Sequence, residues 1–228
     1  TGTRTGEAQF RSNRGSAMNT TNGVGRGDLQ ILRERNYNAV VEKIERIHDA
    51  LLILRVRPDE PLEPFEAGQY TLLGLGSWEP AIGEETPARD ATKANLIKRA
   101  YSISCSLVDA TGRLARVTEQ GALEFYVALV RPVDGRTSRL TPRLFALQRG
   151  DRLYCDRRAR GRYTLGAIDA EDHVFFAATG TGEAPHNAMV AELLSRGHRG
   201  HIASAVCVRY ERDLAYRSAH RLLQQRCA

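Results

Sequence analysis

The stretch Arg99-Ala100-Tyr101-Ser102-Ile103-Ser104 decides how the rest of the chain is interpreted. Side chains of an extended strand alternate between its faces, so Arg99 and Tyr101 are expected on one face and Ser102 on the other. An arginine fork binds phosphate, a tyrosine ring stacks on another ring, and a serine hydroxyl can hydrogen-bond to a ring nitrogen. These groups suit a flavin nucleotide, although an ordinary half-buried strand with one exposed arginine fits the same residues.

The chain has 228 residues, of which 42% are hydrophobic, and its formal net charge is +6. This length and composition are comfortable for two globular domains with cores of their own. The positive charge favours an anionic partner, such as a phosphate, an acidic protein or a nucleic acid, and does not choose among them.

The four cysteines lie far apart and form no zinc or iron–sulfur spacing; they are Cys105, Cys155, Cys207 and Cys227. We therefore expect reduced thiols, no bound metal and a cytoplasmic location. No apolar run is long enough to span a bilayer, and no secretory signal is present at the start. We expect no association with a membrane.

The first 35 residues are predicted to be a disordered leader. This start is rich in glycine, threonine, asparagine, serine and arginine, so ordering it would cost more conformational entropy than burial returns. An organelle transit peptide is an alternative for this acid-poor start, although it lacks a clear amphipathic period.

Residues 36–167 contain short apolar runs separated by turn residues. Residues 39–44 and 50–56 predict a β-hairpin, and the stretch 65–73 is expected to turn at Gly68 into another strand. Three more strands are expected at 100–108, 123–130 and 152–156. Many short strands at near-regular spacing favour an antiparallel β-barrel or sandwich. The polar stretch 74–98, which holds Trp78, is expected to be a long surface loop.

One helix is expected among these strands. Thr141 is a good capping residue, and Pro142 is a good first helical residue. A helix start offers free backbone donors and a positive dipole to a phosphate. A helix that only plugs the barrel fits the same residues.

Residues 168–228 show the pattern of a parallel α/β domain. The apolar run 173–178 predicts a strand covered on both faces, followed by the turn Gly180-Thr181-Gly182 and a helix. A second buried strand at 202–208 and a second helix at 213–225 complete the βαβα order.

The turn Gly180-Thr181-Gly182 lies where a strand gives way to a helix, which is a position for a pyrophosphate. Pro185 stands where a GxGxxG fingerprint needs its third glycine, so the ordinary Rossmann motif is absent. Arg209 follows the second strand, where an arginine suits the 2′-phosphate of NADP; with Glu211 nearby, a solvated polar turn is the alternative. His186 is interpreted as a packing or polar contact rather than as an acid or base.

Five motifs follow one another along the chain: Arg-Ala-Tyr-Ser (99–102), Leu-Glu-Phe-Tyr (123–126), Leu-Thr-Pro-Arg-Leu (140–144), Gly-Asp (150–151) and Gly-Thr-Gly-x-Ala-Pro (180–185). In this order they resemble the ferredoxin–NADP reductases, and the bacterial flavodoxin/ferredoxin type most. The resemblance runs from about residue 37 to the end. It implies an antiparallel, FAD-binding β-barrel domain at 36–167 and a parallel α/β, NADP-binding domain at 168–228, the latter incomplete.

The resemblance also implies roles for single residues. Arg99 matches the residue that binds the flavin phosphate, Tyr101 the ring that stacks on the flavin, and Ser102 the hydroxyl at its reactive nitrogen. Tyr101 and Ser102 are thereby the implied catalytic residues. The other implied cofactor contacts are Ala100, Tyr126, Arg139, Leu140 and Thr141 for FAD, and Gly180, Thr181, Gly182, Val208 and Arg209 for NADP(H).

The implied activity is hydride exchange between NADP(H) and FAD, followed by single-electron exchange with a ferredoxin or flavodoxin. We expect a monomer that binds neither nucleic acid nor membrane. Some residues depart from the family pattern, namely Ser138 in place of a glycine and Glu183, His186 and Asn187 beside the glycine turn. Only two βα units precede Ala228, which predicts a chain truncated at its C-terminal side.

Two other functions remain open. The first is the reductase component of an oxygenase, which often carries an added iron–sulfur domain for which this chain has no cysteine set. The second is a basic barrel module that binds an acidic protein or nucleic acid, for which basic and aromatic residues should interleave on exposed strands.

Overall fold

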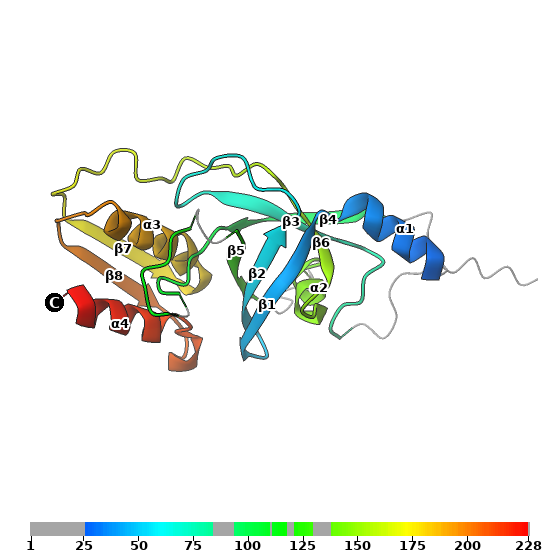
Figure 1. The fold of residues 1–228 in the computed structure, drawn as a ribbon. Helices are drawn as coiled ribbons and strands as arrows, with labels where there is room; N and C mark the ends of the chain where they lie inside the picture. Colours follow the sequence, from blue (N-terminus) through cyan, green and yellow to red (C-terminus); the bar gives the residue numbers. More distant parts are fainter. Residues whose placement is uncertain (1–25, 84–93, 110, 118–120, 130–137, 228) are drawn as a thin grey trace, which may run out of the picture.

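The computed structural model describes residues 26–83, 94–109, 111–117, 121–129 and 138–227. They form an antiparallel β unit and a parallel α/β unit that lie side by side (Figure 1). Within these ranges, every helix is too short or too polar to cross a membrane. The elements are α1 (Arg26–Asn36), β1 (Ala39–His48), β2 (Leu51–Pro58), β3 (Tyr70–Gly76), β4 (Leu96–Ser102), β5 (Leu123–Ala128), α2 (Thr141–Ala146), β6 (Arg152–Cys155), β7 (Val174–Thr179), the 3-10 turn η2 (Gly180–Gly182), α3 (Glu183–Ser195), β8 (Ile202–Cys207), the 3-10 turn η3 (Glu211–Asp213) and α4 (Arg217–Cys227).

Six strands form the antiparallel sheet in the order β4-β3-β6-β1-β2-β5. The predicted hairpin is confirmed, since β1 and β2 pair from Ala39 opposite Pro58 to His48 opposite Leu51. The edge strands β4 and β5 approach each other beyond the end of β4, where Ser104 and Glu124 form an isolated bridge. The sheet therefore curls like a barrel, but the described residues form no continuous ladder that closes it.

The core of this unit follows the period-two pattern of its strands. Leu52, Leu54 and Val56 alternate along β2, and each is fully buried. Phe125 and Val127 on β5 are buried as completely. Burying one such side chain contributes about 1.5–3 kcal/mol, so these alternating positions fix which face of the sheet turns inward.

The predicted disordered leader is wrong for residues 26–35, which belong to α1. Leu29 and Leu32 pack against the core. Arg33 donates two hydrogen bonds to the buried carboxylate of Glu79, with Nε–Oε1 at 2.9 Å and Nη2–Oε2 at 2.7 Å. This partner lies 46 residues further along the chain, so no local pattern indicates it. The rest of the predicted leader lies outside the described residues.

The predicted surface loop at 74–98 is also partly wrong. β3 continues to Gly76, and β4 begins at Leu96. Trp78 is only 4% exposed, because its ring lies directly against the backbone of Gly76. Residues 84–93 of this loop lie outside the described part of the chain. The apolar ring and the buried Glu79 make this segment part of the core rather than a solvated loop.

We expect Gly76→Ala to lower the free energy of unfolding by about 1–3 kcal/mol, as overpacking of a core does. A Cβ atom at this position would lie 2.0 Å from Cε2 of Trp78, so the ring must move. Gly27→Ala is the matched control, because nothing lies within 4 Å of its Cβ position and alanine favours a helix. Urea unfolding measures both variants. Equal midpoints for Gly76→Ala and the unmodified chain would contradict this packing.

The second unit begins as predicted with a βαβ arrangement. β7 and β8 are parallel, from Val174 opposite Ile202 to Thr179 opposite Cys207, and α3 connects them. The prediction that the first strand is covered on both faces is wrong. Phe176 is buried beneath α3, whereas Phe175, which points the other way, is 68% exposed. No element of the described residues packs on that outer face.

Candidate functional site

A cavity of about 800 Å³ lies between the two units. The antiparallel unit contributes the β1–β2 turn and the end of β5, and the parallel unit contributes the segments that follow β7 and β8. The carboxyl ends of parallel strands are where open α/β sheets bind ligands. The sequence-predicted residues that line this cavity together are Tyr126, Gly180, Thr181, Val208 and Arg209.

The glycine turn gives the cavity an open backbone wall. Gly180 has φ of +53°, in the left-handed region that favours glycine, and a Cβ there would meet no atom within 4 Å. Gly182 precedes α3, and no side chain caps the start of this helix. The N–H of Glu183 already donates to the carbonyls of Gly180 and Thr181, so the helix start offers an anion its positive dipole rather than a free first N–H group.

Arg209 lies at the rim of the cavity with its side chain exposed. Glu211, which could have neutralised it, pairs instead with Arg217. The neighbouring Arg212 lies over the ring of Tyr210, 5.0 Å from its centroid. Among the described residues Arg209 has no ion-pair partner, so its guanidinium is available to an anion in the cavity.

Asp213 joins the two units at the floor of the cavity. The hydroxyl of Tyr126 donates to the backbone carbonyl of Asp213 at 2.7 Å, and Nε2 of His48 lies 2.9 Å from its Oδ1. Burial, reinforced by the negative charge of Glu183, raises the pKa of Tyr126, so its hydroxyl remains a donor. Tyr126 is thereby held in one orientation by a residue of the opposite unit.

A buried polar network lies behind this contact. The hydroxyl of Tyr216 donates to Oε1 of Glu124 at 3.0 Å, and Ser104 donates to the Tyr216 hydroxyl at 3.1 Å. Ser106 donates to the other carboxylate oxygen of Glu124. Burial raises the pKa of Glu124, while these hydrogen bonds act in the opposite direction. None of these residues was expected to have a role from the sequence, although Glu124 lies within the motif Leu-Glu-Phe-Tyr at 123–126.

The predicted flavin residues of β4 lie outside the residues that line this cavity. Leu73 pairs with Arg99 and Thr71 pairs with Tyr101, and both β3 residues are fully buried. Paired residues share a face, so Arg99 and Tyr101 stand on the inner face of the sheet. Arg99 is nevertheless exposed and Tyr101 only half-buried, which means that the inner face opens to solvent at this edge.

The side chains at this open edge fit a flavin nucleotide. Nη1 of Arg99 donates to the backbone carbonyl of Lys98 at 2.8 Å. A guanidinium has five N–H donors, so others remain available to a phosphate. Burial raises the pKa of Tyr101, while the charge of Arg99 acts against it, so the ring is an uncharged phenol. Ala100 is exposed and Ser102 half-buried on the opposite face.

The segment Arg139-Leu140-Thr141 forms the start of α2, but Thr141 is not its cap as predicted. Leu140 occupies the cap position, and no side chain of the cap bonds to the helix. The hydroxyl of Ser138 accepts from the backbone N–H of Thr141 at 3.4 Å and takes over that role. The buried hydroxyl of Thr141 has no hydrogen-bond partner among the described residues. Such an unsatisfied group fits a site that receives a polar ligand.

His186 lies inside the parallel unit and has a packing role, as predicted. Its ring stacks on Phe176 with centroids 4.9 Å apart, and its Nε2 lies 2.9 Å from the hydroxyl of Tyr163. Burial lowers the pKa of His186, with the charge of Glu183 acting against this shift. In the described ranges no group of acidic, histidine and cysteine side chains is arranged to hold a metal ion.

No protein-family model matches the sequence. The chain is 30% identical over 186 residues to the flavodoxin/ferredoxin–NADP reductase of Escherichia coli K12, which covers 82% of this chain and 62% of that protein. Its identity to the enzyme of the same name from Buchnera aphidicola subsp. Schizaphis graminum is 28% over 179 residues, covering 78% and 60%. The chain thus spans about three fifths of the length of these curated relatives.

The fold matches a solved structure of the same kind. A ferredoxin–NADP+ reductase from Neisseria gonorrhoeae, with bound FAD and NADP, aligns with a TM-score of 0.61 at 18% identity. The alignment covers 83% of this chain and 64% of that one. The likeness extends over both units, which agrees with the expected two-domain order.

Proposed function

Because the chain is homologous to the flavodoxin/ferredoxin–NADP reductases, we propose that it binds FAD and NADP(H) and transfers electrons between NADP(H) and a ferredoxin or flavodoxin. The observation that carries this proposal is the cavity between the units. Three separate segments line it, with Tyr126, the Gly180-Thr181 turn and Arg209. Each of these segments matches a motif that implies a nucleotide cofactor.

The antiparallel unit is the proposed FAD-binding barrel. Arg99 neutralises phosphate charge, Tyr101 stacks on the flavin ring, and Ser102 hydrogen-bonds to it; Ala100 leaves room for the cofactor beside them. The start of α2, with Arg139, Leu140 and the unsatisfied hydroxyl of Thr141, is proposed as a second contact to FAD. FAD itself supplies the ability to accept a hydride and release single electrons.

The parallel unit is the proposed NADP(H) site. The backbone at Gly180, Thr181 and Gly182 lets the nucleotide approach closely, since no Cβ stands at the glycines. Val208 and Arg209 follow β8, and the exposed guanidinium of Arg209 is suited to the 2′-phosphate that distinguishes NADP from NAD. The chain's role is to orient the nicotinamide toward the cavity and to neutralise phosphate charge.

The proposed electron-carrier partner is an acidic protein. The net charge of +6 raises the encounter rate with a negatively charged partner, and this effect falls as salt is added. We propose that one chain acts alone with its carrier, as a monomer.

Purification of the 228-residue chain tests the proposal directly. We expect a yellow protein with one flavin per chain, or a colourless one that takes up added FAD. NADP+ should then perturb the visible spectrum of the bound flavin, because both cofactors are proposed to meet at the cavity. A colourless preparation that ignores FAD and retains nucleic acid would instead support the basic binding module.

A further inference from the structure

The segment after β6 carries the densest basic sequence of the chain's described part. Residues 157–162 read Arg-Arg-Ala-Arg-Gly-Arg, and all four arginines are exposed. Tyr163 follows directly and is 55% exposed. We call residues 157–163 the arginine turn. The proposed FAD and NADP(H) contacts make no use of it.

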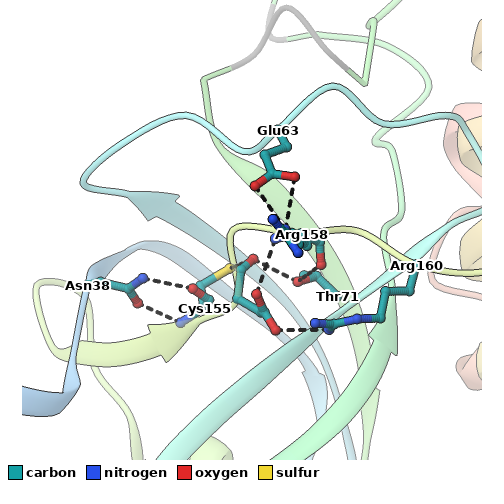
Figure 2. A network of polar contacts seen from close by, with 7 residues as sticks. Asn38, Glu63, Thr71, Cys155, Arg158 and Arg160 are labelled. Atoms are coloured by element: carbon teal, nitrogen blue, oxygen red, sulfur yellow. Dashed lines mark hydrogen bonds and ion pairs between the residues drawn. The ribbon is translucent and has the colours of Figure 1, made fainter.

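The backbone of the arginine turn is held firmly against the sheet. Arg160 and Tyr70 exchange two backbone hydrogen bonds, at 2.9 and 2.8 Å. The hydroxyl of Thr71 donates to the carbonyl of Asp156 at 2.8 Å and lies 3.3 Å from that of Arg158. Figure 2 shows the contacts of Thr71 beside the paired bonds of Asn38 with Cys155. A turn whose backbone is fixed in this way needs no backbone ordering on binding, which lowers the entropic cost of docking.

The arginines of the arginine turn form only weak, solvent-exposed ion pairs within the chain. Arg157, Arg158 and Arg160 form ion pairs with Glu60, Glu63 and Asp156, respectively. Such half-exposed pairs contribute about 0–1 kcal/mol each, so a carboxylate from another protein can replace Glu60 or Glu63 at little cost. Arg162 forms no ion pair among the described residues.

The arginine turn also lies close to the proposed flavin strand. Tyr70 pairs with Ser102 of β4 along one edge of β3 and bridges to Arg160 along the other. Two strand spacings therefore separate Ser102 from Arg160, roughly 10 Å. Lys98, which shares the outer face of β4 with Ser102, adds positive charge there and forms no ion pair in the described ranges.

We propose that the arginine turn is the docking surface for an acidic electron-carrier protein. The inference rests on the proposed function and assigns the carrier to a defined surface. Carboxylates of the carrier pair with Arg158 and Arg162, and the exposed ring of Tyr163 provides an aromatic anchor; arginine and tyrosine are the residue types that dominate binding energy at interfaces. Docking there brings the carrier beside β4.

The test compares two double variants of the FAD-loaded chain, with a recombinant acidic flavodoxin as the probe. Arg158→Glu/Arg162→Glu reverses two charges of the arginine turn. Arg196→Glu/Arg199→Glu makes the same charge change at the far end of the parallel unit, where both arginines are exposed and paired with acidic side chains. We expect the first pair to weaken flavodoxin binding at least tenfold at low salt, and the difference to shrink at high salt.

The two double variants separate a local docking surface from a general effect of net charge. Equal loss in both double variants would show a general charge effect and overturn the docking surface, as would unchanged binding by Arg158→Glu/Arg162→Glu. FAD content and melting temperature should be the same in both variants, because neither pair contacts the proposed cofactor sites. If the unmodified chain binds FAD and NADP+ but neither flavodoxin nor ferredoxin, the carrier part of the proposed function fails together with this surface.

Discussion

Tyr101→Ala is expected to weaken FAD binding by roughly ten- to a hundredfold, because stacking of an aromatic ring on a base contributes about 1–3 kcal/mol. Tyr101 is half-buried on the inner face of β4, where the sheet opens to solvent, and burial keeps its hydroxyl uncharged. The ring therefore has a fixed, neutral face to offer. Titration of FAD into the flavin-free chain, followed by quenching of flavin fluorescence, measures the affinity.

Tyr154→Ala is the matched control. Tyr154 is also a half-buried tyrosine of the same sheet, but its ring lies under Nζ of Lys98, 3.6 Å away, on the outer face. Arg99→Ala should lower FAD affinity to a similar degree as Tyr101→Ala, with Lys98→Ala as its own control, because a charge-assisted hydrogen bond to phosphate contributes about 1.5–3 kcal/mol. Unchanged flavin content in both Arg99→Ala and Tyr101→Ala would contradict the assignment of β4 as the flavin strand.

Arg209→Ala is expected to reduce the affinity for NADP+ by roughly ten- to a hundredfold while leaving that for NAD+ nearly unchanged. Arg209 is exposed at the rim of the cavity, and Glu211 is occupied by Arg217. The guanidinium thus has no competing carboxylate to release before it meets the 2′-phosphate. Calorimetry of the FAD-loaded chain with each dinucleotide measures the two affinities without requiring turnover.

The control for this prediction is Arg199→Ala, which removes the same charge from a residue paired with Glu171, away from the cavity. It should leave both dinucleotide affinities unchanged. Equal losses of NADP+ and NAD+ binding in Arg209→Ala would mean that this arginine does not recognise the 2′-phosphate.

The strands could be predicted because their signals are local. Alternation of apolar residues located β1 and β2, and the continuous apolar runs located β7 and β8, within a few residues of their ends. Contacts between distant segments left no such signal. α1 depends on Glu79, and Trp78 is buried against Gly76, so both segments looked like solvated chain in isolation. Phe175 is exposed because no described element packs on that face of the two-stranded sheet. The apolar sequence of one strand does not show whether another element covers its second face.

The candidate site was predicted unevenly. Tyr126, Thr181 and Arg209 line one cavity. Thr181 and Arg209 were predictable because ligands bind at the carboxyl ends of parallel strands, where their motifs lie. The roles of the β4 residues stay a prediction. Glu124 and Tyr216 were missed, since a buried carboxylate that accepts from a distant tyrosine is visible only once both units are placed together.

Asp213 and Tyr216 of the parallel unit form hydrogen bonds with the antiparallel unit, so the shape of the cavity depends on both units. A chimaera that exchanges the parallel unit for a homologous one would have to carry matching partners for His48, Tyr126 and Glu124 across the new junction. A transplanted parallel unit without equivalents of Asp213 and Tyr216 would leave the hydroxyl of Tyr126 without its acceptor and Oε1 of Glu124 without its tyrosine donor. Engineering of nucleotide preference is therefore best confined to exposed residues at the rim of the cavity, such as Arg209. These can change without disturbing the hydrogen bonds between the two units.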